Sequence, residues 1–209
     1  MSSSWEAPAP DVKDWTWVLD RPCPECGTAS AALDVEDLPP LLAVTTEAWH
    51  RVLALPGAAE RPRPGTWSPL EYGAHVRDVH RVFDERLALV LETHPGPARF
   101  ANWDQDAAAV EGRYHEQDPA VVADELADAA ERVARRYARV GPDDLARTGL
   151  RSNGSAFSLV TLGQYHLHDV VHHLHDVGAP VRDALPAPAR TTVRTPAGPP
   201  AAATPGEGA

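Results

Sequence analysis

The chain has 209 residues, enough for one domain with a substantial core, and its formal net charge at pH 7 is −11. An acidic protein of this kind is a poor partner for nucleic acid or for an anionic membrane surface. No apolar run reaches the length of about 18 residues that a membrane span needs, and the first residues lack the pattern of a secretory signal. We therefore expect a cytoplasmic protein that acts on a small molecule.

Composition divides the chain into three parts. Residues 1–37 form an N-terminal extension with a Cys-x-x-Cys motif, residues 38–180 contain long amphipathic segments, and residues 181–209 are rich in Pro and Ala. A tail of that composition cannot bury enough apolar surface to offset the entropy lost on ordering it, so we expect it to be disordered.

Four segments of the central part have the apolar periodicity of helices, and almost none of the chain alternates as a strand does. Ser68, Pro69 and Glu71 form a capping-box sequence before the second segment, and Gly178 is placed to end the fourth. The segments cover about residues 41–55, 69–93, 119–140 and 158–177. Four long helices without strands predict an all-α fold, an antiparallel four-helix bundle with an N-terminal loop extension.

A ten-residue stretch of the last predicted helix contains five of the ten histidines: His166, His168, His172, His173 and His175. Histidine is the commonest metal ligand, and an i,i+4 spacing places two imidazoles on one helix face. The segment therefore indicates a metal site, and the question is which of its faces forms it.

A helix advances about 100° per residue, so each side chain can be assigned to a face. The apolar stripe of the last helix is centred about 80° from His173, which places His173 at the edge of the stripe and Asp169 one turn earlier. His75 occupies the same edge of the second predicted helix. Such edges meet in a bundle, so we expect His75, Asp169 and His173 to converge. Two imidazoles and a carboxylate, with positions left open, suit Zn, Ni, Fe or Mn.

The pair His168 and His172 is the alternative, because it has the same i,i+4 spacing and could join His75 instead. That choice requires the face opposite the apolar stripe, where the counting places these two histidines and His175, toward solvent or a partner. The plainest interpretation is that these histidines are exposed on a polar face, with one or two of them satisfied in the core. His80 is expected at the surface or at an interface.

Cys23 and Cys26 are the only cysteines, too few for a disulfide framework. Three interpretations stay open: an N-terminal turn with free thiols or an adventitious disulfide, half of a structural metal site, or a redox pair. A closed metal site would need histidines or a second chain to complete it.

A polar string in the long connection before the third predicted helix includes Trp103, Asp104 and Asp106. An aromatic surface beside carboxylates is typical of a pocket wall, although a capped loop with Trp103 buried would have the same sequence. Arg151, in a turn before the last helix, could meet an anionic ligand there or serve the turn alone.

The string from Trp67 to Val76, WSPLEYGAHV, and the later Asp169-x-x-x-His173-Leu174 resemble the DinB-like superfamily over about residues 38–178. The resemblance implies a four-helix bundle whose second helix supplies one histidine to a divalent metal, while the last helix supplies an H-x-x-x-H pair. The second member of that pair matches His173. The first falls on Asp169, so this chain has a carboxylate where the family has a histidine.

The same resemblance implies thiol chemistry, since characterised members transfer bacillithiol or mycothiol to electrophiles and a relative isomerises maleylpyruvate with mycothiol. We therefore expect a metal-dependent thiol transferase or isomerase that acts on a small electrophile with a low-molecular-weight thiol. The resemblance also implies a homodimer. Two other functions stay open, a metal-dependent hydrolase that uses no thiol and a non-catalytic metal-binding or stress-response module.

Overall fold

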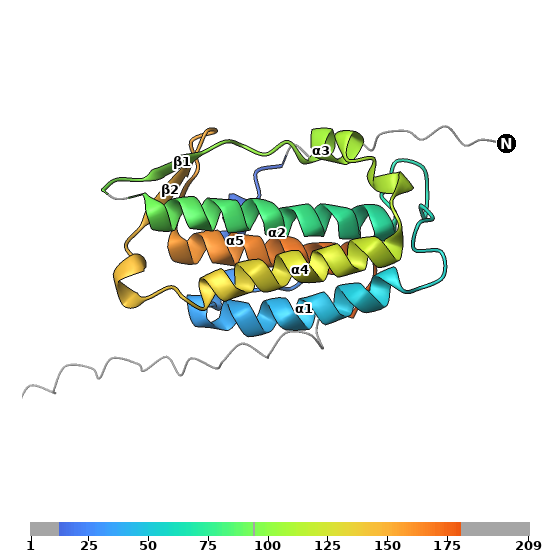
Figure 1. Cartoon of the computed structure of the whole chain (residues 1–209), viewed down its shortest axis with the longest axis horizontal. Coiled ribbons are helices and arrows are strands. Elements are labelled where there is room, and N and C mark those ends of the chain that lie inside the picture. Colours follow the sequence, from blue (N-terminus) through green and yellow to red (C-terminus); the bar gives the residue numbers. More distant parts are fainter. Residues whose placement is uncertain (1–12, 94, 181–209) are drawn as a thin grey trace, which may run out of the picture.

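The structure is a computed structural model that describes residues 13–93 and 95–180. Its four long helices are α1 (Leu38–Leu53), α2 (Pro69–Glu92), α4 (Pro119–Tyr137) and α5 (Leu159–Asp176), and they pack as a bundle (Figure 1). The four-helix bundle expected from the sequence is confirmed, with boundaries that shift by a few residues. The tail expected at residues 181–209 lies outside the described residues.

The helices run in two directions, α1 and α5 one way and α2 and α4 the other (Figure 1). Because α2 and α4 point the same way, the chain must return along the bundle between them. The returning segment contains a short strand, β1 (Ala98–Phe100), and a short helix, α3 (Gln105–Glu111), and it crosses over α2 (Figure 1). This crossing segment forms one wall of the candidate site.

The ends of α2 and α5 are held by side chains that satisfy backbone N–H groups left free in the first turn. Ser68 Oγ accepts a hydrogen bond from Glu71 N at 3.2 Å, and the Glu71 carboxylate accepts one from Ser68 N at 2.8 Å. Ser158 Oγ accepts a hydrogen bond from Thr161 N at 3.1 Å at the start of α5. The capping box predicted for α2 is therefore present.

The core lies between the four helices and is filled by large apolar side chains. Along α5, Leu167, Val170 and Leu174 are fully buried, as the helical counting requires for its apolar stripe. The largest fully buried side chains elsewhere in the bundle include Trp49, Leu42, Leu87, Leu126 and Tyr137. This packing sets the rotation of α5, and so decides which of its polar side chains face α2.

Three short strands form a sheet at one end of the bundle, which the sequence analysis did not predict. β1 pairs in parallel with β2 (Thr148–Arg151), and β2 pairs antiparallel with β3 (Ala156–Ser158). Strands of three or four residues are too short to show alternation, so tertiary contacts alone reveal them. The sheet ties the crossing segment to the start of α5.

The described part of the N-terminal extension, residues 13–37, lies against α5. It contains three 3-10 turns, η1 (Thr16–Leu19), η2 (Ser30–Ala32) and η3 (Val35–Asp37), and Val18 is fully buried. Gln164 on α5 donates a hydrogen bond from its amide nitrogen to Leu33 O at 2.7 Å. The extension therefore covers a face of α5 that would otherwise meet solvent. Within the described residues no helix has the length and apolar character needed to cross a membrane.

We expect Ser68→Ala to lower the free energy of unfolding by about 1 kcal/mol, because it removes the hydroxyl that caps α2. Urea denaturation followed by circular dichroism measures the change. Thr46→Ala is the matched control, since the Thr46 hydroxyl donates to Leu42 O within α1 and caps no helix end. An equal loss in both variants would show that the cap is not the cause.

Candidate metal centre

α2 and α5 bring His75, Asp169 and His173 together. His75 Nε2 lies 3.4 Å from Asp169 Oδ1, and His173 Nε2 lies 3.4 Å from the same oxygen. The two imidazole rings stand nearly perpendicular, with centroids 4.7 Å apart. One ligand atom from each residue falls within a group whose members all lie within 4.8 Å of one another. The three residues that the sequence analysis singled out are thus neighbours in the fold.

His75 is fully buried, and neither of its ring nitrogens has a hydrogen-bond partner among the described residues; the same is true of Asp169 Oδ1. Buried polar atoms without partners cost about 1–3 kcal/mol each. Nitrogen and oxygen ligands at tetrahedral angles around a cation such as Zn²⁺ would lie about 3.4 Å apart, which agrees with both observed distances. The donor set and its unsatisfied atoms therefore fit a divalent cation.

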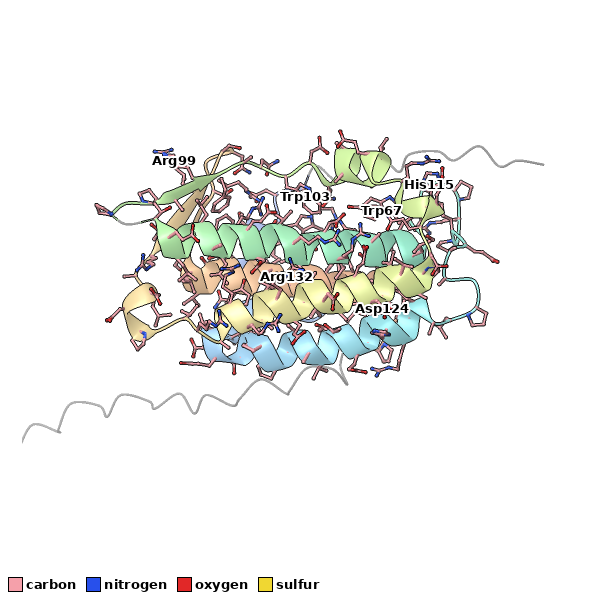
Figure 2. The ribbon with its side chains drawn as sticks, in the orientation of Figure 1. Trp67, Arg99, Trp103, His115, Asp124 and Arg132 are labelled. Atoms are coloured by element: carbon pink, nitrogen blue, oxygen red, sulfur yellow. The ribbon has the colours of Figure 1, made fainter. Side chains whose placement is uncertain are left out.

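Aromatic side chains keep water away from His75. Its ring stacks on Trp103, with centroids 5.3 Å apart and planes 16° apart, and lies 5.4 Å from the ring of Trp67. Trp103 belongs to the crossing segment between β1 and α3, and Trp67 lies just before α2 (Figure 2). Trp103, which the sequence offered as a possible pocket residue, therefore covers the ring of His75.

The protonation of the three residues differs because their surroundings differ. Burial lowers the pKa of His75, which leaves the imidazole neutral. Burial opposes the charge on His173, but its contacts with the carboxylates of Asp169 and Asp176 outweigh that effect and raise its pKa to about 9. Burial also favours the neutral form of Asp169, yet the contacts with His173 and His75 hold its pKa well below the usual range. A carboxylate anion is thus kept between two imidazoles.

Asp176 orients the ring of His173. Its Oδ2 lies 2.8 Å from His173 Nδ1, which leaves Nε2 directed toward Asp169. A carboxylate that binds one ring nitrogen fixes the tautomer and makes the other nitrogen a better ligand.

Two cavities adjoin this group, and Asp169 lines both. A cavity of about 260 Å³ is bounded by Tyr72, His173 and Asp176 together with residues of the N-terminal extension. The other, of about 550 Å³, is lined by the four residues that the sequence offered as possible pocket residues: Trp103, Asp104, Asp106 and Arg151. A small molecule in either cavity would lie beside the carboxylate of Asp169.

The larger cavity contains a second buried guanidinium that the sequence analysis missed, Arg86 on α2. Arg86 and Arg151 are 8% and 9% exposed, and neither forms an ion pair with a carboxylate of the described residues. Burial, with a further contribution from Arg151, lowers the pKa of Arg86 to about 10, so it stays charged at neutral pH. Arg86 lies about three turns after His75, at nearly the same helix edge, and that spacing could have indicated it.

Three histidines lie elsewhere than the sequence analysis expected. His168 and His172 are 3% and 6% exposed, because the N-terminal extension covers the face that was assigned to solvent or a partner. His80 is fully buried rather than at a surface, with its Nδ1 2.9 Å from Nε2 of His166 in the core. His175 is exposed, as expected.

Cys23 and Cys26 are buried and form no disulfide. They lie beside His168 and His172, and not among the residues that line the two cavities.

Comparison of the structure with solved structures finds the same fold in two other proteins. YfiT from Bacillus subtilis, described as a probable metal-dependent hydrolase with an unusual four-helix bundle topology, aligns with a TM-score of 0.59 and 17% identity over 69% of this chain and 84% of its own. A mycothiol-dependent maleylpyruvate isomerase aligns with a TM-score of 0.55 and 14% identity over 73% of this chain. This chain spans 64% of the isomerase, and a variant of the isomerase aligns similarly, with a TM-score of 0.57.

The search of curated proteins found no match. At the identities of the solved structures the likeness shows a shared fold and no shared activity. Between residues 36 and 179, however, the sequence matches the model of the DinB superfamily. That stretch holds all four long helices together with His75, Asp169 and His173. The chain belongs to the DinB superfamily.

Proposed function

We propose that this protein is a divalent-metal-dependent enzyme that acts on a small electrophile, either transferring a low-molecular-weight thiol to it or isomerising it with that thiol. His75, Asp169 and His173 are the proposed metal ligands. The observation that carries the proposal is the buried imidazole of His75, whose nitrogens make no hydrogen bond among the described residues. It faces His173 and Asp169, and Asp169 lines both cavities. Three protein ligands leave positions open for a reactant, as in catalytic rather than structural sites.

A divalent cation bound here would lower the pKa of a coordinated thiol or water and so supply a nucleophile at neutral pH. The chain's own residues prepare the site. Asp169 contributes the negative charge, Asp176 orients His173, and Trp67 and Trp103 shield His75 from water. Shielding strengthens every electrostatic interaction at the site because it lowers the local dielectric.

An external thiol is supported by the cavity walls, since no cysteine lines either of them. The nucleophile must then come from a free thiol or from water. The isomerase of the same fold is mycothiol-dependent, which favours the thiol. Low-molecular-weight thiols are kept reduced in the cytoplasm, where we propose that the protein works. A homodimer stays a prediction.

The substrate that we propose carries an anionic group. Arg86 and Arg151 place two buried positive charges in the 550 Å³ cavity, and Asp169 lies in the same wall. A carboxylate on the substrate could bind the guanidiniums while its electrophilic carbon lies near the metal, since planar guanidinium and carboxylate groups match each other's geometry.

A hydrolase that uses water instead of a thiol is the second candidate. Asp104 and Asp106 line the larger cavity and could accept a proton from water, and YfiT is described as a probable metal-dependent hydrolase. Turnover of esters or amides that is independent of added thiol would favour this candidate. Stoichiometric metal without turnover of any electrophile would favour a non-catalytic module.

We expect His75→Ala and His173→Ala each to remove about one equivalent of metal from protein purified without an affinity tag. Each variant keeps only two of the three protein ligands, and water does not make up for the lost one. Inductively coupled plasma mass spectrometry measures the metal. His175→Ala is the matched control, since this exposed side chain lies on the same helix. Unchanged metal content in His75→Ala and His173→Ala would contradict the proposed ligands.

We expect Arg86→Gln and Arg151→Gln to lower kcat/KM for an anionic electrophile about tenfold or more, since each removes a hydrogen bond to a charged group worth about 1.5–3 kcal/mol. A neutral electrophile of similar size is the control substrate, and its kcat/KM should stay within about twofold in folded variants. Both arms need saturating mycothiol or bacillithiol. Equal losses for the two substrates would show that the arginines act on the fold and not on the anion.

A further inference from the structure

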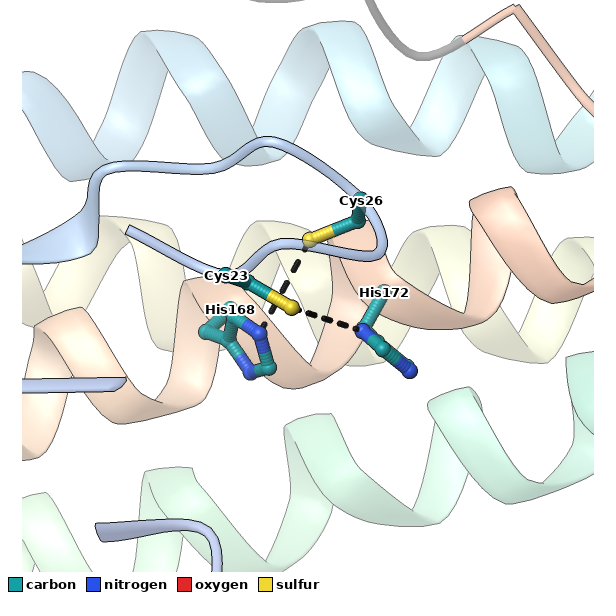
Figure 3. A group of neighbouring side chains, drawn as sticks. All are labelled: Cys23, Cys26, His168 and His172. Atoms are coloured by element: carbon teal, nitrogen blue, oxygen red, sulfur yellow. Dashed lines mark hydrogen bonds between the residues drawn. The ribbon is translucent and has the colours of Figure 1, made fainter. Parts of the chain in front are cut away.

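A second group of potential metal ligands lies on another face of α5, about 100° around the helix from Asp169 and His173. Cys23 and Cys26 point from the N-terminal extension toward His168 and His172 on α5 (Figure 3). Cys23 Sγ lies 3.6 Å from His172 Nδ1, and Cys26 Sγ lies 3.8 Å from His168 Nε2. All four side chains are buried, with exposures between 1% and 7%.

These distances agree with a tetrahedral zinc site. With Zn–S bonds of about 2.3 Å and Zn–N bonds of about 2.0–2.1 Å, sulfur and nitrogen ligands at tetrahedral angles lie about 3.6 Å apart. The ligand atoms of the four residues all lie within 4.8 Å of one another. Two thiolates and two neutral imidazoles around Zn²⁺ have no net charge, so the group can be buried without an unpaired charge.

The local backbone is shaped for this arrangement. Cys23 and Cys26 lie in a tight turn in which Gly27 N donates to Cys23 O at 2.8 Å and Cys23 N donates to Thr28 O at 2.9 Å. Gly27 has a φ of +76°, a conformation that glycine adopts without strain. On α5 the i,i+4 spacing of His168 and His172 places both rings on one face. The spacings C-x2-C and H-x3-H are those of structural zinc sites.

Neighbouring side chains support the ring of His172. Its Nδ1 faces Cys23, and its Nε2 faces the carboxylates of Glu25 at 3.5 Å and Asp176 at 3.7 Å. A carboxylate beside the second nitrogen is the usual partner of a metal-bound imidazole. The ring of Trp15 covers the site from the extension, with its centroid 4.8 Å from that of His172.

We propose that Cys23, Cys26, His168 and His172 bind a structural Zn²⁺ that fastens the N-terminal extension to α5. Each thiol releases its proton to solvent when it binds. Four protein ligands leave no position open, so this zinc performs no chemistry. Its effect on the enzyme is through the extension, because Lys13, Asp14 and Trp15 line the 550 Å³ cavity. Without the zinc, the attachment of that wall to α5 would depend on the burial of Val18 and on the hydrogen bond from Gln164 to Leu33 O.

The wild-type protein, purified without an affinity tag under reducing conditions, tests this proposal directly. Zinc X-ray absorption should show sulfur in the first coordination shell, and replacement by Co²⁺ should produce a thiolate-to-cobalt charge-transfer band. The triad of His75, Asp169 and His173 contains no sulfur, so it cannot give either signal in protein that has been dialysed free of small thiols and kept reduced with a phosphine. A first coordination shell of nitrogen and oxygen alone would overturn the proposal. So would zinc-free protein whose mass is lower by two hydrogens, because that difference indicates a Cys23–Cys26 disulfide.

Substitutions separate this site from the triad. Cys26→Ser should remove the charge-transfer band and about one equivalent of zinc, and should make residues 13–37 sensitive to limited proteolysis. His75→Ala should leave the band intact while it removes the other metal. His175→Ala is the control for a histidine change on α5. If Cys26→Ser fails to fold, the spectra of the wild-type protein and of His75→Ala still decide the outcome.

Discussion

The apposition of α2 and α5 around one half-buried carboxylate is the constraint on which the rest of the structure depends. Asp169 lies between His75 and His173, and the two imidazoles stand 3.4 Å from one of its oxygens. A polar group inside a helical bundle is costly unless it is paired, so the register of the two helices has little freedom. Trp67 and Trp103 close the site above His75, which couples the crossing segment to the same arrangement.

Helix α5 carries two ligand pairs that point in different directions. Asp169 and His173 face α2, whereas His168 and His172, each one residue earlier, face the N-terminal extension. One residue corresponds to a rotation of about 100°, so the same i,i+4 spacing serves both faces without interference. The sequence offered these two pairs as alternative ligands of a single metal. In the structure they face different neighbours, so each pair can belong to a site of its own. The first would form the proposed open site beside the cavities, and the second the proposed closed site with two cysteines.

The larger cavity is assembled from parts of the chain that lie far apart in sequence. The N-terminal extension supplies Trp15, α2 supplies Arg86, the crossing segment supplies Trp103, and the turn after β2 supplies Asn153. Such a cavity depends on how each part is fastened to the bundle. The sheet fastens the crossing segment and the β2–β3 turn, and the proposed zinc would fasten the extension.

By itself the sequence determined the four long helices, the capping box at Ser68 and the helix edge shared by His75 and His173, because periodicity and caps are local properties of the chain. Strands of three or four residues and the contact between His80 and His166 could not be predicted, since each requires a partner distant in sequence. The face of α5 that holds His168 and His172 shows the limit most clearly. Counting along one helix identifies which side chains share a face, and only the tertiary structure decides what covers that face.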